Sequence, residues 1–275
     1  MLDDTDPHRL GLVLGGGGAR GLCHIGVWRV LEELGIRPDL IAGTSMGGLV
    51  GAFIAAGHDA DALERIAKDV SWPKLINWGL TGRLVSTARF RSWLAEHLPE
   101  TFEELELPLV LTATDIVEGQ IHYLHSGDLI TALQATVAYP GALDSVQVGD
   151  AVLVDGGVLN QIPVDGARFL GADRIIAVNA TALEPLEESG SSRSRRPAFL
   201  RTGVTALREA MRAIDVMQTQ LSTVRLSLYR PDVLIDPRIG GVELPDFHKA
   251  AQAIAAGEEA TRAEADRLRE LRIRP

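Results

Sequence analysis

The chain has 275 residues, of which 46% are hydrophobic and 5% aromatic. This length and composition suit a globular protein with a sizeable core and exclude a disordered or low-complexity chain. Its 27 basic and 37 acidic residues give a formal net charge of −10, which disfavours nonspecific binding to nucleic acid or broad anionic surfaces. We therefore expect one domain over residues 1–275 and no nucleic-acid partner.

The N-terminal residues and the cysteine content bear on location. Met1 to Pro7 is acidic and polar, so it lacks the basic start and apolar centre of a secretory signal. No apolar run in the sequence is long enough to span a bilayer. Cys23 is the single cysteine, which suits a reducing compartment, and its place in a predicted helix makes it a small buried hydrophobe. We expect a cytoplasmic chain and leave peripheral contact with the inner face of the membrane open.

The first elements of the chain form a strand, a tight loop and a helix. Leu10 to Leu14 is a short apolar run that ends in four glycines, Gly15 to Gly18. Apolar residues then recur at helical spacing from Leu22 to Leu34. A second buried strand is predicted at Leu40 to Ala42, and a second helix from Met46 to about Ala56.

Strands continue to alternate with helical stretches further along the chain. We expect strands at Leu109–Ala113, Val152–Val154, Ile175–Val178 and Val233–Ile235, and a hairpin strand at Gln120–Leu124. This alternation predicts an α/β sandwich with a mainly parallel sheet. Its core would span about 10–180, with a C-terminal helical and strand extension over about 198–271. Within that extension, Phe247–Leu271 has helical rhythm.

Two segments have a less regular pattern. Ser71–Phe102 is rich in Trp, Arg and Leu, whereas Leu183–Pro197 is rich in Ser, Glu and Arg and resembles a surface loop. Aromatic residues of the first segment fit an acyl channel, a membrane-interface contact or the packing of a cap equally: Trp72, Trp78, Phe90 and Trp93. Four arginines lie in or shortly after the second segment: Arg193, Arg195, Arg196 and Arg201. They are suited to bind phosphate headgroups or, more simply, belong to a solvated loop.

The pentapeptide Gly43-Thr44-Ser45-Met46-Gly47 matches the G-x-S-x-G pattern and lies between a predicted buried strand and a helix, as that pattern requires. Gly43 and Gly47 remove side chains that would collide in a sharp turn, so the backbone can hold Ser45 in a strained, exposed position. The helix that follows favours developing negative charge at its N-terminus. The simpler alternative is that Ser45 only caps this helix.

The glycine loop from Gly15 to Gly21 also joins a strand to a helix, and its successive amides are suited to bind an oxyanion. Loops that follow adjacent parallel strands lie at the same sheet edge, so this loop is expected near Ser45. The loop also contains G-x-G-x-x-G, a dinucleotide-binding pattern. That alternative is disfavoured because the second strand ends in Gly43-Thr44-Ser45 and lacks the acidic residue that the fingerprint needs there.

The third motif, Asp155-Gly156-Gly157, places an aspartate at the carboxyl end of the Val152–Val154 strand, where a catalytic base would lie. Alone, such a sequence is more often a turn whose aspartate bonds its own backbone. Together with the two preceding motifs, it indicates a catalytic group.

With these three motifs in order, the sequence resembles the patatin-like phospholipases, particularly bacterial proteins related to the neuropathy target esterase catalytic domain. The resemblance covers almost the whole chain and implies a three-layer α/β/α sandwich. It rests on Gly15-Gly16-Gly17-Gly18-Ala19-Arg20-Gly21, His24-Ile25-Gly26-Val27, Gly43-Thr44-Ser45-Met46-Gly47-Gly48, and Asp155-Gly156-Gly157 followed by Asn160-Gln161-Ile162-Pro163-Val164. The sequence departs from the family pattern at Ala138-Tyr139-Pro140-Gly141-Ala142-Leu143-Asp144-Ser145, where relatives tend to have Pro-Gly-x-Phe-Pro-Pro. This departure affects the expected shape of the substrate pocket.

The resemblance implies a Ser45–Asp155 dyad, with Ser45 as nucleophile and Asp155 as base. It also implies an oxyanion hole made by the amides of Gly16, Gly17 and Gly18, a loop braced by Arg20, and supporting roles for Gly43 and Gly47. Because a free aspartate with a pKa of about 3.9 is a poor base at neutral pH, we expect Asp155 to be partly desolvated with a raised pKa.

Histidines offer a competing arrangement, the serine–acid–histidine triad of the α/β-hydrolases. Only His248 follows Asp155, and its predicted place at a helix start favours a surface position. His24 is interpreted as packing in the first helix. His122 and His125 have the spacing of a metal pair but no evident third ligand, so we expect no metal site.

Asp115, at the end of the Leu109 strand, is expected to bond nearby backbone, although it also fits a position pointing towards the site. The sequence thus predicts a cofactor-independent serine hydrolase of acyl esters, with phospholipid or lysophospholipid as the leading substrate class. A noncatalytic lipid-binding or regulatory protein of the same fold is the alternative.

Overall fold

The computed structural model describes residues 9–75, 87–181 and 203–273. Its strands are Leu10–Leu14 (β1), Leu40–Thr44 (β2), Leu109–Asp115 (β3), Gln120–Leu124 (β4), Val146–Val148 (β5), Ala151–Asp155 (β6), Arg174–Val178 (β7) and Val233–Ile235 (β8). They form one sheet in the order β5-β6-β3-β2-β1-β7-β8, and β4 pairs with β3 outside this path. Strands β3, β2, β1, β7 and β8 are parallel neighbours, which confirms the mainly parallel sheet.

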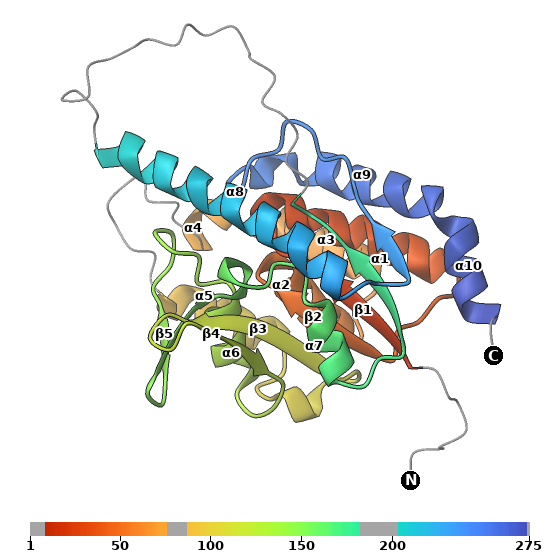
Figure 1. The fold of residues 1–275 in the computed structure, drawn as a ribbon, viewed down its shortest axis with the longest axis horizontal. Coiled ribbons are helices and arrows are strands. Elements are labelled where there is room, and N and C mark those ends of the chain that lie inside the picture. The colour runs from red at the N-terminus through yellow and green to blue at the C-terminus, as the bar shows by residue number, and fades with distance from the viewer. Residues whose placement is uncertain (1–8, 76–86, 182–202, 274–275) are drawn as a thin grey trace, which may run out of the picture.

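Helices cover both faces of this sheet (Figure 1). The α-helices are Cys23–Glu33 (α1), Met46–Ala55 (α2), Ala60–Asp69 (α3), Trp72–Leu75 (α4), Thr87–His97 (α5), Leu129–Thr136 (α6), Val164–Phe169 (α7), Gly203–Leu228 (α8), Ala250–Ala263 (α9) and Ala265–Ile273 (α10). On one face, Leu12 and Ile41 of the sheet share a core with α1, α2 and α9. On the other, Val13 and Ala42 share a core with α7 and with Leu226 of α8. The expected three-layer α/β/α architecture is therefore confirmed.

Strand β3 brings two distant strand ends together. Its parallel partner β2 ends with Thr44 opposite Thr112, and its antiparallel partner β6 ends with Asp155 opposite Ala113. Both partners lie on the same edge of β3, because β4 occupies the other edge over Leu111–Asp115. β2 and β6 thus run towards each other and stop at adjacent positions. Asp155 therefore reaches the site from the opposite direction to β1 and β2.

Most predicted strands are present, but the Ser71–Phe102 segment is more regular than its sequence indicates. Its described residues contain α4 and α5. Helix α5 buries Phe90 and Leu94, while Arg91 donates to the Thr131 hydroxyl of α6. These tertiary contacts, rather than a clear amphipathic pattern, stabilise the helix. Trp78, the Leu183–Pro197 segment predicted to be a surface loop, and the arginines at 193, 195, 196 and 201 lie outside the described residues.

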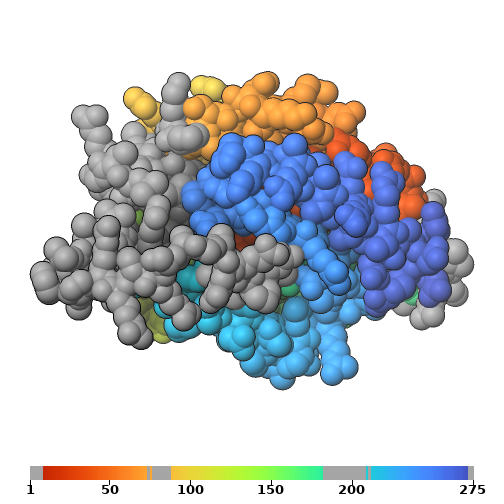
Figure 2. Space-filling model, turned by 90° about the horizontal axis from the view of Figure 1, so that it is seen from above, coloured from red at the N-terminus to blue at the C-terminus, as the bar shows by residue number. Residues whose placement is uncertain are grey.

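The C-terminal helices pack directly on the N-terminal part of the fold. Figure 2 shows the blue helices beside the orange and red segments of α3 and α1. Helices α1 and α9 approach closely at two glycines, Gly26 and Gly257. A Cβ at Gly26 would lie only 2.0 Å from the Ile254 carbonyl oxygen, and a Cβ at Gly257 only 2.0 Å from the Cys23 carbonyl oxygen, so no larger residue fits at either position. This contact supports our proposal that the chain forms one domain. None of the helices in the described ranges is both long and apolar enough to cross a membrane.

Candidate active site

Ser45 occupies a sharp turn between β2 and α2. Its backbone has φ 54° and ψ −125°, and among the described residues it is the single non-glycine with positive φ. The Ser45 amide donates to the Thr136 hydroxyl at 2.9 Å, which fixes the turn from the neighbouring helix α6. Strain of this kind in a β-strand-to-helix turn presents the serine side chain above the strand end. No side-chain hydrogen bond from Ser45 caps α2, so the simple capping role does not explain the residue.

Glycines on both sides of Ser45 allow backbone contacts that no other residue permits. A Cβ at Gly47 would lie 2.2 Å from the carbonyl oxygen of Leu14 and 2.5 Å from that of Gly15. A Cβ at Gly43 would lie 2.5 Å from Cα of Gly48. Helix α2 therefore begins in direct contact with the end of β1, and this contact brings Ser45 to the glycine loop.

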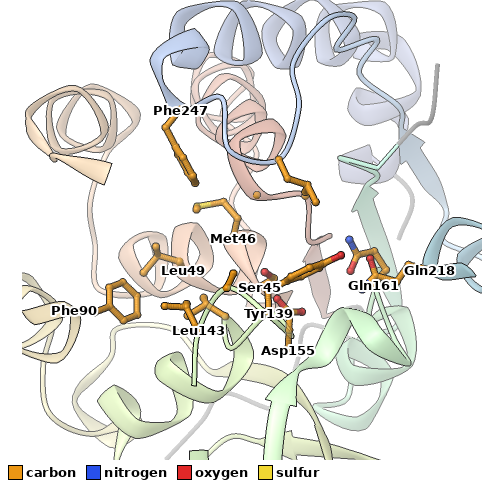
Figure 3. Close-up of a pocket in the computed structure, with 15 residues that line it drawn as sticks. Ser45, Met46, Leu49, Phe90, Tyr139, Leu143, Asp155, Gln161, Gln218 and Phe247 are labelled. Carbon is orange, nitrogen blue, oxygen red and sulfur yellow. The ribbon is translucent and has the colours of Figure 1, made fainter. Parts of the chain in front are cut away.

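Asp155 lies at the end of β6 with 1% of its surface exposed. Its Oδ1 accepts a hydrogen bond of 2.7 Å from the Gly157 amide, so the aspartate does form the ordinary turn as well. Among the described residues, Oδ2 has no hydrogen-bond partner of good geometry. The Ser45 hydroxyl nevertheless lies close enough to oppose the effect of burial on the Asp155 pKa. In Figure 3 the two side chains lie next to each other at the centre of a cavity.

Burial raises the pKa of Asp155 from 3.8 to about 7, while the Ser45 and Gly157 hydrogen bonds act in the opposite direction. Water cannot stabilise the charged form inside the protein, so protonation becomes easier. The carboxylate is therefore a much stronger base than a free aspartate, as expected from the sequence. A pKa near neutrality suits a group that must accept and return a proton at physiological pH.

The glycine loop between β1 and α1 offers fewer free amides than the sequence indicates. The Gly15 amide donates to the Val178 carbonyl and the Gly16 amide to the Gln161 carbonyl, both at 3.0 Å. Gly16 is therefore not a free oxyanion donor, and this part of the prediction is wrong. For the amides of Gly17 and Gly18, no acceptor is present in the part of the chain that the structure describes. Both residues line the cavity beside Ser45.

His24 contacts the backbone of the glycine loop through a buried hydrogen bond. The histidine is fully buried, and its Nε2 lies 2.7 Å from the Gly15 carbonyl oxygen, so Nε2 carries the proton and donates it. Burial lowers the His24 pKa to about 4. The helical position of His24 in the sequence predicts a packing role, and the buried hydrogen bond adds a positioning role for the loop. Arg20 contributes a weaker contact, from its Nε to the Gly17 carbonyl oxygen at 3.5 Å.

A buried hydrogen-bond network connects the serine strand to the segment after Asp155. The Thr44 hydroxyl contacts the Thr112 hydroxyl and donates to the Asn160 carbonyl oxygen at 2.9 Å. The Asn160 side chain donates to Asp165 at 2.8 Å and accepts from Arg225 of α8 at 3.0 Å. Sequence reasoning noted Asn160 only as part of a motif. The network holds β2 and the Asp155 turn at a fixed separation.

The cavity around Ser45 has an apolar end and a polar end (Figure 3). It is lined by Gly17, Gly18, Ser45, Met46, Leu49, Phe90, Val137, Tyr139, Ala142, Leu143, Asp155, Gln161, Gln218, Leu244 and Phe247. Phe90, Leu49 and Leu143 lie on one side of Ser45, whereas Gln161 and Gln218 lie on the other. Phe90 thus belongs to the cavity wall, while Trp72 stacks on Phe247 with ring centroids 4.4 Å apart.

His248, His122, His125 and Asp115 are not among the residues that line this cavity. The His248 side chain is exposed. His122 lies 3.7 Å from the Asp115 carboxylate, and His125 packs on the Phe169 ring. Asp115 accepts a hydrogen bond of 2.9 Å from the Val117 amide, which is the expected structural contact and lowers its pKa. In the described ranges, no three histidine, cysteine or acidic side chains form a cluster that could hold a metal ion.

Solved structures include a protein of similar fold. VipD from Legionella pneumophila superposes with a TM-score of 0.60 at 16% identity, covering 95% of this chain and 67% of VipD. At that identity the likeness concerns the fold alone.

Sequence comparisons point to one family. An uncharacterized NTE family protein of Mycobacterium tuberculosis is 32% identical over 200 residues, covering 69% of this chain and 52% of the relative. A second uncharacterized NTE family protein from the same species is 32% identical over 281 residues, covering 92% of this chain and 46% of the relative. Human patatin-like phospholipase domain-containing protein 6 is 33% identical over 182 residues, covering 62% of this chain and 13% of the relative. The chain thus spans about half the length of the mycobacterial relatives. Residues 12–168 match the patatin-like phospholipase model, so the chain belongs to the patatin-like phospholipase family.

Proposed function

We propose that the chain hydrolyses acyl esters of lipids through a covalent intermediate on Ser45, with Asp155 as the base. The observation that carries this proposal is the pairing of a strained, cavity-facing serine with a buried carboxylate whose pKa is about 7. Family membership supports a lipid substrate, and the apolar end of the cavity is suited to an acyl chain. A phospholipid or lysophospholipid is the leading substrate class.

In the first half of the reaction, the Ser45 hydroxyl oxygen attacks the ester carbonyl while the Asp155 carboxylate accepts its proton. The resulting oxyanion is stabilised by the amides of Gly17 and Gly18. The tetrahedral intermediate then expels the alcohol, which takes the proton from Asp155, and leaves an acyl-serine. In the second half, water attacks this ester while Asp155 accepts a proton again, and the fatty acid and free Ser45 are released. The cycle uses no metal ion or organic cofactor.

The test is labelling by a long-chain fluorophosphonate, read by intact mass and peptide mapping, together with turnover of a long-chain ester. We expect one adduct on Ser45 in the wild type and neither adduct nor turnover in Ser45→Ala. Ser227→Ala, which changes an exposed serine of α8, is the matched control and should behave as wild type. A folded wild type with neither adduct nor turnover would favour the noncatalytic lipid-binding alternative.

A further inference from the structure

Gln218 of α8 has a buried amide with an unused donor. The residue is 5% exposed, and its Nε2 has no hydrogen-bond partner in the described ranges. Among the described residues, just two fully buried side-chain polar atoms lack a partner, and the other is Oδ2 of Asp155. Both residues line the same cavity. The Asp155 oxygen faces the Ser45 hydroxyl, whereas the Gln218 donor faces no such group in the described part of the chain. An unpaired buried donor is costly to a fold, so its position on the cavity wall indicates that a ligand pairs with it.

The position of Gln218 shows which part of an ester it would meet. In Figure 3, Ser45 lies between the apolar side chains of Phe90 and Leu143 and the two amides of Gln161 and Gln218. An ester whose carbonyl is at Ser45 and whose acyl chain lies on the apolar side directs its alcohol portion towards the amides. An amide N–H binds an oxygen acceptor, and it gains nothing from a hydrocarbon.

We infer that Gln218 binds an oxygen of the substrate's alcohol portion, so that the enzyme selects esters of oxygen-bearing alcohols, such as glycerol or a phosphorylated glycerol, over esters of plain alcohols. The inference rests on the proposed function. Tyr139, which also lines the cavity, donates its own hydroxyl to Asp215 at 3.0 Å. Gln218 therefore supplies a donor that this tyrosine does not.

The experiment compares Gln218→Met, which keeps the length of the side chain without the donor, with Gln220→Met, a control at an exposed glutamine of the same helix. Each protein is assayed on three esters that carry the same acyl chain and differ only in the alcohol: a glyceryl ester, a lysophospholipid and a propyl ester. In Gln218→Met, kcat/KM should fall about tenfold for the oxygen-bearing esters and stay within about twofold for the propyl ester. Gln220→Met should change none of them.

Ratios between substrates within one protein do not depend on how much of it is folded, so they separate recognition from stability. The unfolding temperature of Gln218→Met should equal or exceed that of the wild type, because an unpaired buried polar group has been removed. A loss on both oxygen-bearing esters identifies a glycerol oxygen, and a loss confined to the lysophospholipid identifies a phosphate oxygen.

An equal loss on all three esters, or no change in their ratio, would overturn the assignment of Gln218 while leaving the proposed function intact. A wild type that cleaves none of the three esters would instead remove the proposed function, and the role of Gln218 with it.

Discussion

Two regions of the cavity are built in different ways. The catalytic edge, formed by Gly17, Gly18, Ser45 and Asp155, lies where strands end, and its atoms are positioned by backbone contacts such as that between Gly47 and Leu14. The outer wall, formed by Gln218, Leu244 and Phe247, is positioned by side-chain packing from segments late in the chain. The first region leaves little room for substitution, whereas the second can change shape one side chain at a time.

We expect the catalytic edge to govern turnover and the outer wall to govern the preference among esters. The family match over residues 12–168 contains the entire catalytic edge and ends before the outer wall begins. The outer wall is therefore not part of the matched family region. We expect substitutions at the catalytic edge to abolish turnover of every ester, and substitutions in the outer wall to change the preference among esters.

The largest effect is expected from Gly47→Ala. The added Cβ would meet the carbonyl oxygens of Leu14 and Gly15 at 2.2 and 2.5 Å, so the start of α2 must move away from the glycine loop. Turnover should fall by at least about 1000-fold, and the free energy of unfolding by more than about 3 kcal/mol. Ester kinetics and chemical denaturation measure both.

Gly166→Ala is the matched control for this substitution. Gly166 lies in α7, and its added Cβ would lie 3.4–3.5 Å from its nearest neighbours, the side chains of Pro163, Tyr123 and Val110, which is ordinary contact. Because alanine favours a helix more than glycine does, this variant should gain about 0.5 kcal/mol of stability and keep full activity. Equal losses of turnover and stability in the two variants would show that the effect of Gly47→Ala does not come from the close backbone contact at the catalytic edge.

The next largest effect concerns pH. With a pKa of about 7, Asp155 is ionised above neutrality and protonated in acid. Since only the ionised form can accept the Ser45 proton, kcat/KM should fall about 100-fold between pH 8 and pH 5, following a single ionisation. A profile that stays flat down to pH 5 would contradict the assignment of Asp155 as a desolvated base.

The same pKa predicts how stability depends on pH. As pH rises from about 4 to 7, Asp155 ionises in the unfolded chain while it stays protonated in the folded protein, so the wild type loses stability over this window. Asp155→Asn removes that effect. The variant should equal the wild type near pH 4 and exceed it above pH 7 by a difference on the order of 4 kcal/mol at most. Denaturation at the two pH values measures this difference, and its reversal would contradict the burial argument.

A smaller effect is expected at His24, which supports the catalytic edge without touching substrate. His24→Leu leaves the Gly15 carbonyl unpaired and loosens the loop that carries the amides of Gly17 and Gly18. We expect kcat to fall about tenfold with little change in KM, because the oxyanion donors act mainly in the transition state. His24→Gln retains an N–H donor and should recover most of the loss. Failure of glutamine to restore kcat would reduce the role of His24 to packing.

The parts of the fold that follow local rules were predictable from the sequence. The strand bounds at Leu10–Leu14, Gln120–Leu124 and Val233–Ile235 agree with the structure, because each is a short apolar or alternating run bounded by turn residues. Strand β5, at Val146–Val148, and helix α5 were not predicted. Both depend on contacts with distant segments, β5 on β6 and α5 on α6, that no local pattern records.

The candidate site divides in the same way. Ser45 and Asp155 belong to motifs, and the structure places them side by side. Their meeting depends on the antiparallel β6, however, and the sequence analysis assigned Asp155 only to the carboxyl end of a strand. Whether a given amide is free, as for Gly16, depends on a partner more than 100 residues away. Gln218 belongs to no motif, and only the three-dimensional structure shows that it is buried and that its Nε2 has no partner among the described residues.

The smallest effect is expected from His248→Ala, which tests the serine–acid–histidine triad. His248 follows Phe247, a residue of the outer wall, so a rearrangement of that segment is the way in which a histidine could reach Ser45. Its side chain is exposed, and Asp155 already lies beside Ser45 with a pKa suited to accept the proton. Turnover of every ester should therefore stay within about twofold of the wild type, with the same pH profile. A loss above about 100-fold, together with a changed pH profile, would mean that His248 is the base. The outer wall would then contribute to the chemistry itself, and the separation between the two regions would not hold.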